Sequence, residues 1–165
     1  MSHLTVARAL SFFETNAEKI TEEQIRICSV PASPFGEQER AEYLKQKFSE
    51  LGLSEVEIDE EGNCLGLLRG DSLKPLLVVS AHLDTVFSKD ADFTVIKREN
   101  KLFAPGIADD GCGLAALIAI AQVIQNEHIA LEGSLLFVGT VGEEGEGNLR
   151  GCSLSFDERA LGFAG

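Results

Sequence analysis

Two short apolar runs on either side of an alanine-rich stretch constrain the fold of this chain more than any other feature. Residues 76–81, with the sequence LLVVSA, and residues 135–138, with the sequence LLFV, have the continuous apolar character of strands covered on both faces. Residues 114–124 between them are apolar and rich in alanine, which favours a largely buried helix. Strand, helix and strand in this order predict a right-handed crossover and a parallel pair of strands.

The first third of the chain is predicted to be helical. We expect one helix at about 4–16 and a second helix after Thr21, whose spacing to Gln24 fits a capping box. Residues 29–36 contain two prolines and break helicity. Residues 37–51 then place apolar side chains at helical spacing, and a glycine suited to a left-handed cap follows them.

Two later segments have the pattern of β-hairpins. Val56 and Ile58 alternate with acidic residues, a turn follows at 61–63, and residues 64–68 return as a second strand. Residues 93–104 show a similar pattern around a polar turn. Helices and strands together in one chain predict the α/β class.

Length, charge and cysteine content exclude several classes of protein. The 165 residues suffice for one ordinary domain, and without a low-complexity linker or repeat they are expected to form one unit. A net charge of −13 argues against nucleic acid and against anionic membranes, because both would repel the chain. The four cysteines form no CxxC pair, which argues against a zinc finger and requires no disulfide framework. No signal peptide or stretch of membrane-spanning length is recognisable, so we expect a cytoplasmic protein.

A histidine and an aspartate directly follow the first apolar run. His82 and Asp84 are two residues apart, so on an extended strand they face the same side. A neutral imidazole is a good zinc ligand, and a neighbouring carboxylate can accept its other N–H and fix the tautomer. Taken alone, the pair is equally consistent with a core histidine and a turn aspartate.

The second and third clusters contain adjacent acidic residues. Asp109 and Asp110 lie in a glycine-rich loop before the predicted helix, where one carboxylate can bridge two metal ions while the other caps the helix. Glu143 and Glu144 follow the second apolar run, and neighbouring side chains there project in opposite directions. We therefore expect Glu144 to bind metal and Glu143 to act as general base. Ordinary capped turns and a solvated acidic loop that includes Glu146 are the alternatives.

The three clusters together outline a two-metal hydrolase site at the ends of successive strands. Two divalent ions normally need more ligands than these clusters supply, so the chain is interpreted as part of an enzyme. His3 and His128 are poor candidates for further ligands. The first lies in the terminal segment, and the second lies at the far end of the predicted helix from Asp109.

The motifs resemble those of the co-catalytic dinuclear zinc exopeptidases and amidohydrolases, a family that includes peptidase T, glutamate carboxypeptidase, aminoacylase and the acetylornithine and succinyl-diaminopimelate deacylases. Its three motifs are similar to residues 80–86 (SAHLDTV), 107–113 (IADDGCG) and 143–151 (EEGEGNLRG), and the segment from Pro34 to Leu51 resembles the segment that precedes them. The resemblance covers almost the whole chain. Gly111 and Cys112 stand where many members carry a lysine and a small residue.

The resemblance implies a three-layer α/β/α sandwich with a mixed, mostly parallel sheet, here truncated. Residues 1–165 would be the N-terminal portion of the catalytic domain, with the lid or dimerisation domain and the C-terminal catalytic part absent. The resemblance also implies that the site binds two zinc ions, for which manganese or cobalt could substitute. His82, Asp109 and Glu144 would be metal ligands, whereas Asp84 would orient the histidine and Glu143 would be the catalytic base.

The implied reaction is hydrolysis of a peptide or N-acyl amide bond near a chain terminus by a water that bridges the two zinc ions. The substrate would be a small peptide or an N-acyl amino acid, and the intact protein could form a homodimer. The segment alone is expected to bind zinc weakly and to be inactive. A two-zinc aminopeptidase of the sister family is one alternative, and a non-catalytic truncated remnant is the other.

Overall fold

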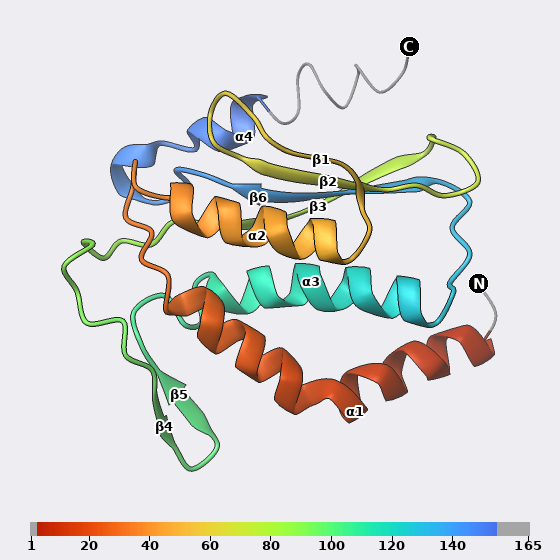
Figure 1. The fold of residues 1–165 in the computed structure, drawn as a ribbon, viewed down its shortest axis with the longest axis horizontal. Coiled ribbons are helices and arrows are strands. Elements are labelled where there is room, and N and C mark those ends of the chain that lie inside the picture. Colours follow the sequence, from red (N-terminus) through yellow and green to blue (C-terminus); the bar gives the residue numbers. More distant parts are fainter. Residues whose placement is uncertain (1–2, 155–165) are drawn as a thin grey trace.

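The computed structural model describes residues 3–154 of the 165, and these form one four-stranded sheet, a separate hairpin and several helices (Figure 1). The elements in chain order are α1 (His3–Cys28), α2 (Gln38–Glu50), β1 (Ser54–Ile58), β2 (Cys64–Leu68), β3 (Leu76–His82), β4 (Ile96–Arg98), β5 (Lys101–Phe103), α3 (Gly111–Asn126), β6 (Ser134–Thr140), a 3₁₀ turn (Gly145–Gly147) and α4 (Arg150–Leu154).

The four-stranded sheet has the order β1-β2-β6-β3. Strands β3 and β6 pair in parallel from Leu76 opposite Ser134 to His82 opposite Thr140, as the strand-helix-strand pattern predicted. The α/β class and the mixed sheet are confirmed. The parallel share is smaller than expected in the described part, because the β1-β2 hairpin joins β6 in antiparallel fashion and leaves one parallel pair beside two antiparallel pairs.

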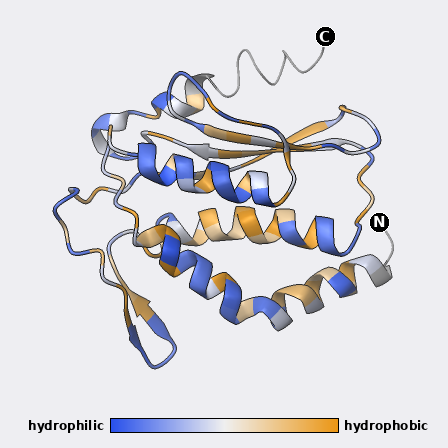
Figure 2. Cartoon of the chain, in the orientation of Figure 1, coloured by the Kyte–Doolittle hydropathy of each residue, from blue (hydrophilic) through white to orange (hydrophobic). Residues whose placement is uncertain are grey.

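The long helices lie on one face of this sheet. Helix α2 packs on β1 and β2, α3 packs on β3, and α1 packs on the outer side of α3 (Figure 1). Residues 3–154 thus supply the sheet and the helices of one face of the expected sandwich. Apolar residues concentrate along α3 and the sheet (Figure 2), and the core between sheet and helices includes the fully buried Leu44, Phe48 and Phe137.

The first helical prediction was wrong, because α1 is a single helix of 26 residues. No glycine or proline lies between His3 and Cys28 to interrupt it. The hydroxyl of Thr21 donates to the carbonyl of Ala17 at 2.8 Å, one turn back, instead of capping a new helix. The helices predicted at 37–51 and 114–124 correspond to α2 and α3, whereas the 3₁₀ turn and α4 were not predicted. In α3 the carboxylate of Asp110 accepts the Gly113 N–H at 2.9 Å and forms the expected N-terminal cap.

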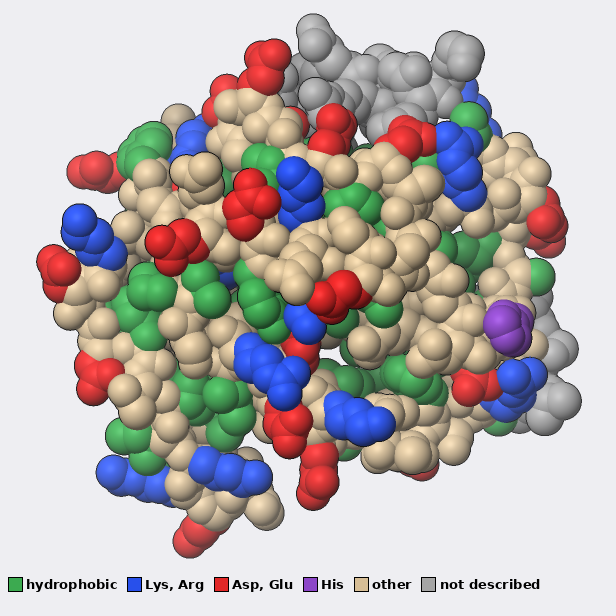
Figure 3. Space-filling view, viewed as in Figure 1, with side chains coloured by type: hydrophobic (Ala, Val, Ile, Leu, Met, Phe, Trp, Pro, Cys, Tyr) green, Lys and Arg blue, Asp and Glu red, His purple; other side chains and the backbone are tan. Residues whose placement is uncertain are grey.

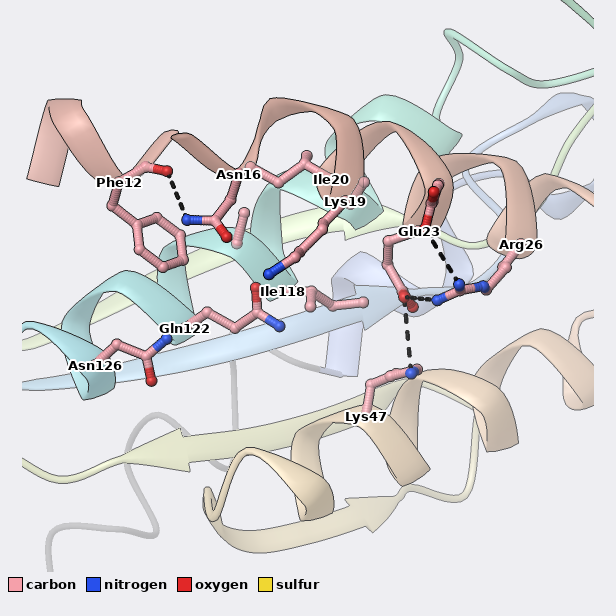
Figure 4. Close-up of a pocket in the computed structure, with 13 residues that line it drawn as sticks. Phe12, Asn16, Lys19, Ile20, Glu23, Arg26, Lys47, Ile118, Gln122 and Asn126 are labelled. Atoms are coloured by element: carbon pink, nitrogen blue, oxygen red, sulfur yellow. Dashed lines mark hydrogen bonds and ion pairs between the residues drawn. The ribbon is translucent and has the colours of Figure 1, made fainter. Parts of the chain in front are cut away.

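Charged side chains of both signs are intermingled on the face shown in Figure 3. A pocket of about 460 Å³ lies between α1, α2 and α3 (Figure 4), where the side chains of Lys19 and Gln122 point toward one another near Ile118. None of the predicted site residues lines this pocket. Within residues 3–154, no helix combines the length and apolar character needed to cross a bilayer.

Candidate metal centre

The parallel pairing of β3 and β6 brings the three sequence clusters to one edge of the sheet. The carboxyl ends of both strands lie side by side, since His82 is opposite Thr140. The amino end of α3, which begins after Asp109 and Asp110, meets them at the left of Figure 1. This is the edge of an α/β sheet at which ligands generally bind.

Both ring nitrogens of His82 are held in place. Nδ1 lies 3.0 Å from the backbone carbonyl oxygen of Asp84, and Nε2 lies 2.8 Å from Oδ1 of Asp109. Burial opposes the charged imidazolium, but the hydrogen bonds with Asp84 and Asp109 outweigh it and raise the pKa of His82 to about 9. The imidazole therefore occupies a strongly negative environment that favours a cation.

The Asp84 carboxylate is fully buried and holds the backbone of the third cluster. Its Oδ1 accepts the N–H of Glu143 at 3.0 Å, and its Oδ2 accepts the N–H of Glu144 at 2.7 Å. Burial alone would raise the pKa of this carboxyl, but the nearby ring of His82 and the hydrogen bonds from the backbone N–H groups of Glu144 and Glu143 lower it below its ordinary value. The carboxylate lies farther from the ring of His82, with 3.7 Å between Oδ1 and Nδ1. From the sequence, the Asp84 carboxylate was expected to accept the second ring N–H of His82, but Nδ1 hydrogen-bonds to the Asp84 backbone carbonyl instead. The two backbone N–H groups that the carboxylate does accept were not predicted.

Three side chains converge at a distance suitable for sharing a metal ion. His82, Glu143 and Glu144 each offer one ligand atom, and these atoms lie within 4.8 Å of one another. Asp109 joins them through its contact with Nε2 of His82 and is largely exposed. Burial and the neighbouring carboxylates of Glu143 and Asp109 raise the pKa of Glu144. Two of the predicted ligands, His82 and Glu144, thus converge with Glu143, the expected base, and the third, Asp109, is linked to this group through His82.

The Asp110 carboxylate accepts two backbone N–H groups and so holds the local structure around the site. One carboxylate oxygen caps α3, and the other accepts the backbone N–H of His82 at 3.1 Å. It thereby links the second cluster to the end of β3. Gln24 of α1 makes a second link, because its side-chain amide donates to the carbonyl of Ile107 at 2.6 Å. No local sequence pattern indicates this contact, which joins residues 83 positions apart.

An ion pair connects the third cluster to the segment before α2. Arg150 lies 2.7 Å from the nearly buried carboxylate of Glu37, and its guanidinium stacks over the ring of Phe35 at 4.4 Å. Glu37 and Arg150 both lie in segments that resemble those of the zinc exopeptidases, but the ion pair between them was not predicted. It fixes the chain just after the two glutamates.

A small pocket adjoins the converging side chains. Its volume is about 230 Å³, and Asp109 and Glu144 are its acidic lining residues. The other lining residues are apolar or small: Val86, Phe87, Ala104, Gly106, Ile107 and Ala108. Whole small-molecule sites are usually about 300–1,000 Å³, so this pocket has the size of a subsite for one substituent.

The donor set fits a divalent metal ion. An imidazole with three nearby carboxylates offers the nitrogen and oxygen ligands that zinc accepts, and manganese accepts the carboxylates as well. The contact of Nδ1 with a backbone carbonyl favours the tautomer in which Nε2 is free to bind metal once it loses its proton. The arrangement can therefore bind a metal ion and place a free carboxylate beside it.

Known proteins with similar sequences and structures are hydrolases where their names state an activity. Residues 78–161 match the sequence model of peptidase family M20/M25/M40. The uncharacterised protein YqjE of Bacillus subtilis is 30% identical over 139 residues, which cover 78% of this chain and 37% of that protein. A succinyl-diaminopimelate desuccinylase of Herminiimonas arsenicoxydans is 32% identical over 132 residues, covering 76% of this chain and 34% of the enzyme.

A solved structure supports the same relationship. The aminopeptidase PepT of Bacillus cereus superposes with a TM-score of 0.66 at 26% identity, over 78% of this chain and 37% of that one. This chain therefore spans only about a third of the length of the relatives it matches.

Proposed function

This chain belongs to peptidase family M20/M25/M40, and on that premise we propose that the protein at its natural length is a metal-dependent hydrolase of peptide or N-acyl amide bonds near a chain terminus. The observation that carries the proposal is the convergence of His82, Glu143 and Glu144 within 4.8 Å, beside Asp109. The names of the relatives, a desuccinylase and an aminopeptidase, support a small peptide or an N-acyl amino acid as substrate.

His82, Asp109 and Glu144 are the side chains that would hold the metal, proposed to be zinc. When bound, the metal would polarise the scissile carbonyl and make a water molecule more acidic. His82 contributes Nε2, because its Nδ1 is oriented by the backbone carbonyl of Asp84. Three or more protein ligands are usual for each catalytic zinc ion, so further ligands must come from outside the described residues.

Glu143 is the proposed general base. The side chain of Glu143 is exposed at the site, so its carboxylate can reach water. Its backbone is held in place because the Glu143 N–H donates to the buried Asp84 carboxylate. Glu143 would take a proton from the attacking water and deliver it to the leaving nitrogen. Asp84 would keep the two glutamates at a constant spacing, since each of its oxygens holds one of their N–H groups.

We propose that residues 1–165 form the N-terminal part of the catalytic domain and that this segment alone binds zinc weakly and is inactive. A cytoplasmic location is also proposed for the protein at its natural length on the sequence features given above, and a homodimer is proposed on the family resemblance. A two-zinc aminopeptidase of the sister family is less well supported, because the match to peptidase family M20/M25/M40 covers all three motifs.

The test is hydrolysis of a panel of dipeptides and N-acyl amino acids by the protein at its natural length. We expect turnover that a chelator abolishes and added zinc, manganese or cobalt restores. His82→Ala should remove it, whereas His128→Asn should not, because His128 is an exposed residue at the end of α3. A metal-loaded, folded protein that cleaves none of these amides would refute the proposal and favour a non-catalytic remnant.

A further inference from the structure

We propose that Arg40 is a positioning residue of the candidate metal centre and acts through the peptide carbonyl between His82 and Asp84. The inference rests on the proposed function in that it takes His82 and its neighbours to bind a metal ion. Arg40 itself touches neither metal nor substrate. Its role would be to fix the backbone from which two of the site side chains project.

Arg40 is an arginine on the buried face of a helix. It is 1% exposed and lies on the same side of α2 as Leu44 and Phe48, at intervals of four residues. Arginine is almost never fully buried unless its donors are satisfied, because burial of an uncompensated charge is costly. A charged residue kept in this position therefore calls for a specific set of partners.

The partners are two backbone carbonyls on different segments. Nε donates to the carbonyl of Val30 at 2.9 Å, and Nη2 donates to the same oxygen. Nη1 donates to the carbonyl of Leu83 at 2.7 Å. Among residues 3–154, no carboxylate forms an ion pair with Arg40 at 4.0 Å or less. The planar guanidinium thus clamps the loop before α2 to the end of β3.

The Leu83 peptide lies at the centre of the site. Its own N–H donates to the carbonyl of Thr140 at 2.7 Å, so this residue is held by β6 on one side and by Arg40 on the other. The residue before it supplies the imidazole, and the residue after it supplies the carboxylate that holds Glu143 and Glu144. A shift of this carbonyl would move both side chains.

The shape of the side chain, rather than its charge, makes these contacts. A guanidinium presents five N–H donors in a rigid fork, which can span two carbonyls, whereas the ammonium of lysine is a point charge on a flexible stem. Arg40→Lys would keep the positive charge but lose the ability to donate to both carbonyls at once. Substitutions that disturb the orientation of metal ligands commonly weaken metal binding by about 10–100-fold, and we expect a loss of that size.

The experiment uses the protein at its natural length with cobalt(II) as a spectroscopic probe. Cobalt affinity and the visible absorption spectrum are measured for the wild type, Arg40→Lys, Arg40→Met and the control Arg26→Lys, whose arginine is exposed at the end of α1. Circular dichroism defines a temperature at which each variant is folded. We expect both Arg40 variants to bind cobalt about 10–100-fold more weakly with a shifted spectrum, and the control to match the wild type.

A folded Arg40→Lys variant with the affinity and spectrum of the wild type would overturn the inference and leave the proposed function intact. A wild-type protein that binds no cobalt would overturn both. If neither Arg40 variant folds, NMR of the wild type decides. Adding zinc should shift the Nε–H resonance of Arg40 but not that of Arg26, and an unchanged Arg40 resonance would overturn the inference.

Discussion

Replacing Asp84 with asparagine should release one of the two glutamate N–H groups from its acceptor. In the folded protein each carboxylate oxygen accepts one N–H, from Glu143 at 3.0 Å and from Glu144 at 2.7 Å, and the side chain is completely buried. Asparagine has one acceptor oxygen, and its amide group would face the other N–H with a donor. A hydrogen bond to a charged group contributes about 1.5–3 kcal/mol, so this is the expected local loss.

Amide hydrogen exchange measured by NMR tests this prediction at the two residues concerned. A loss of about 1.5–3 kcal/mol should speed exchange at one of the two amides by about 10–150-fold. Asp92→Asn is the matched control. Its exposed carboxylate also accepts a backbone N–H, that of Thr94 at 2.9 Å, and an asparagine oxygen can keep that bond.

Wild-type exchange rates at both glutamate amides in a folded Asp84→Asn protein would contradict this role of Asp84. They would mean that the carboxylate does not hold the third cluster and acts on the ring of His82 alone.

Three further predictions concern proton binding, catalysis and packing. In the metal-free protein, the raised pKa of His82, about 9 against an ordinary 6.5, means that its stabilising contribution is complete below pH 6.5 and is lost as pH rises towards 9, which NMR titration and unfolding at several pH values would measure. Glu143→Gln should slow amide hydrolysis by about 10²–10⁴-fold and leave zinc binding measurable by calorimetry, because the general base is lost while the proposed ligands remain. Gly111→Ala should destabilise the fold by about 1–3 kcal/mol in urea unfolding, because its Cβ would lie 2.3 Å from Sγ of Cys28.

Each of these predictions has a contradicting outcome. A His82 ring that titrates near 6.5 without metal would exclude the negative environment described for it. Unchanged turnover in Glu143→Gln would assign the base to another group. For the glycine, Ala116→Gly in the same helix is a control for helix propensity, and equal stability of Gly111→Ala and wild type would mean that Cys28 moves aside at no cost.

Local pattern predicted most of the elements that form the site. The parallel pair followed from the strand-helix-strand order, and the Asp110 cap followed from an acid before a helix. The site clusters were identified because each lies directly after an apolar run or before a helix. In each case a short stretch of sequence carries the information, since side-chain spacing and chain connectivity decide the outcome.

Contacts between segments far apart in the chain were harder to predict from the sequence. The antiparallel union of β2 with β6 joins segments about 70 residues apart, and no local pattern specifies it. The helix predicted to stop before Thr21 continued because a threonine can bond to its own helix as well as cap a new one. Arg40 did leave a signal, a charged residue on the apolar face of α2, but its two carbonyl partners could not be read from the sequence.

Calorimetric titration of the protein at its natural length with zinc shows directly whether this edge of the sheet binds metal. We expect two bound ions in the wild type, with binding weakened or lost in both His82→Ala and Asp109→Ala and unchanged in His128→Asn. Zinc binding that is absent from the folded wild type, or that persists unchanged in both ligand variants, would contradict the assignment of this edge of the sheet as a metal centre.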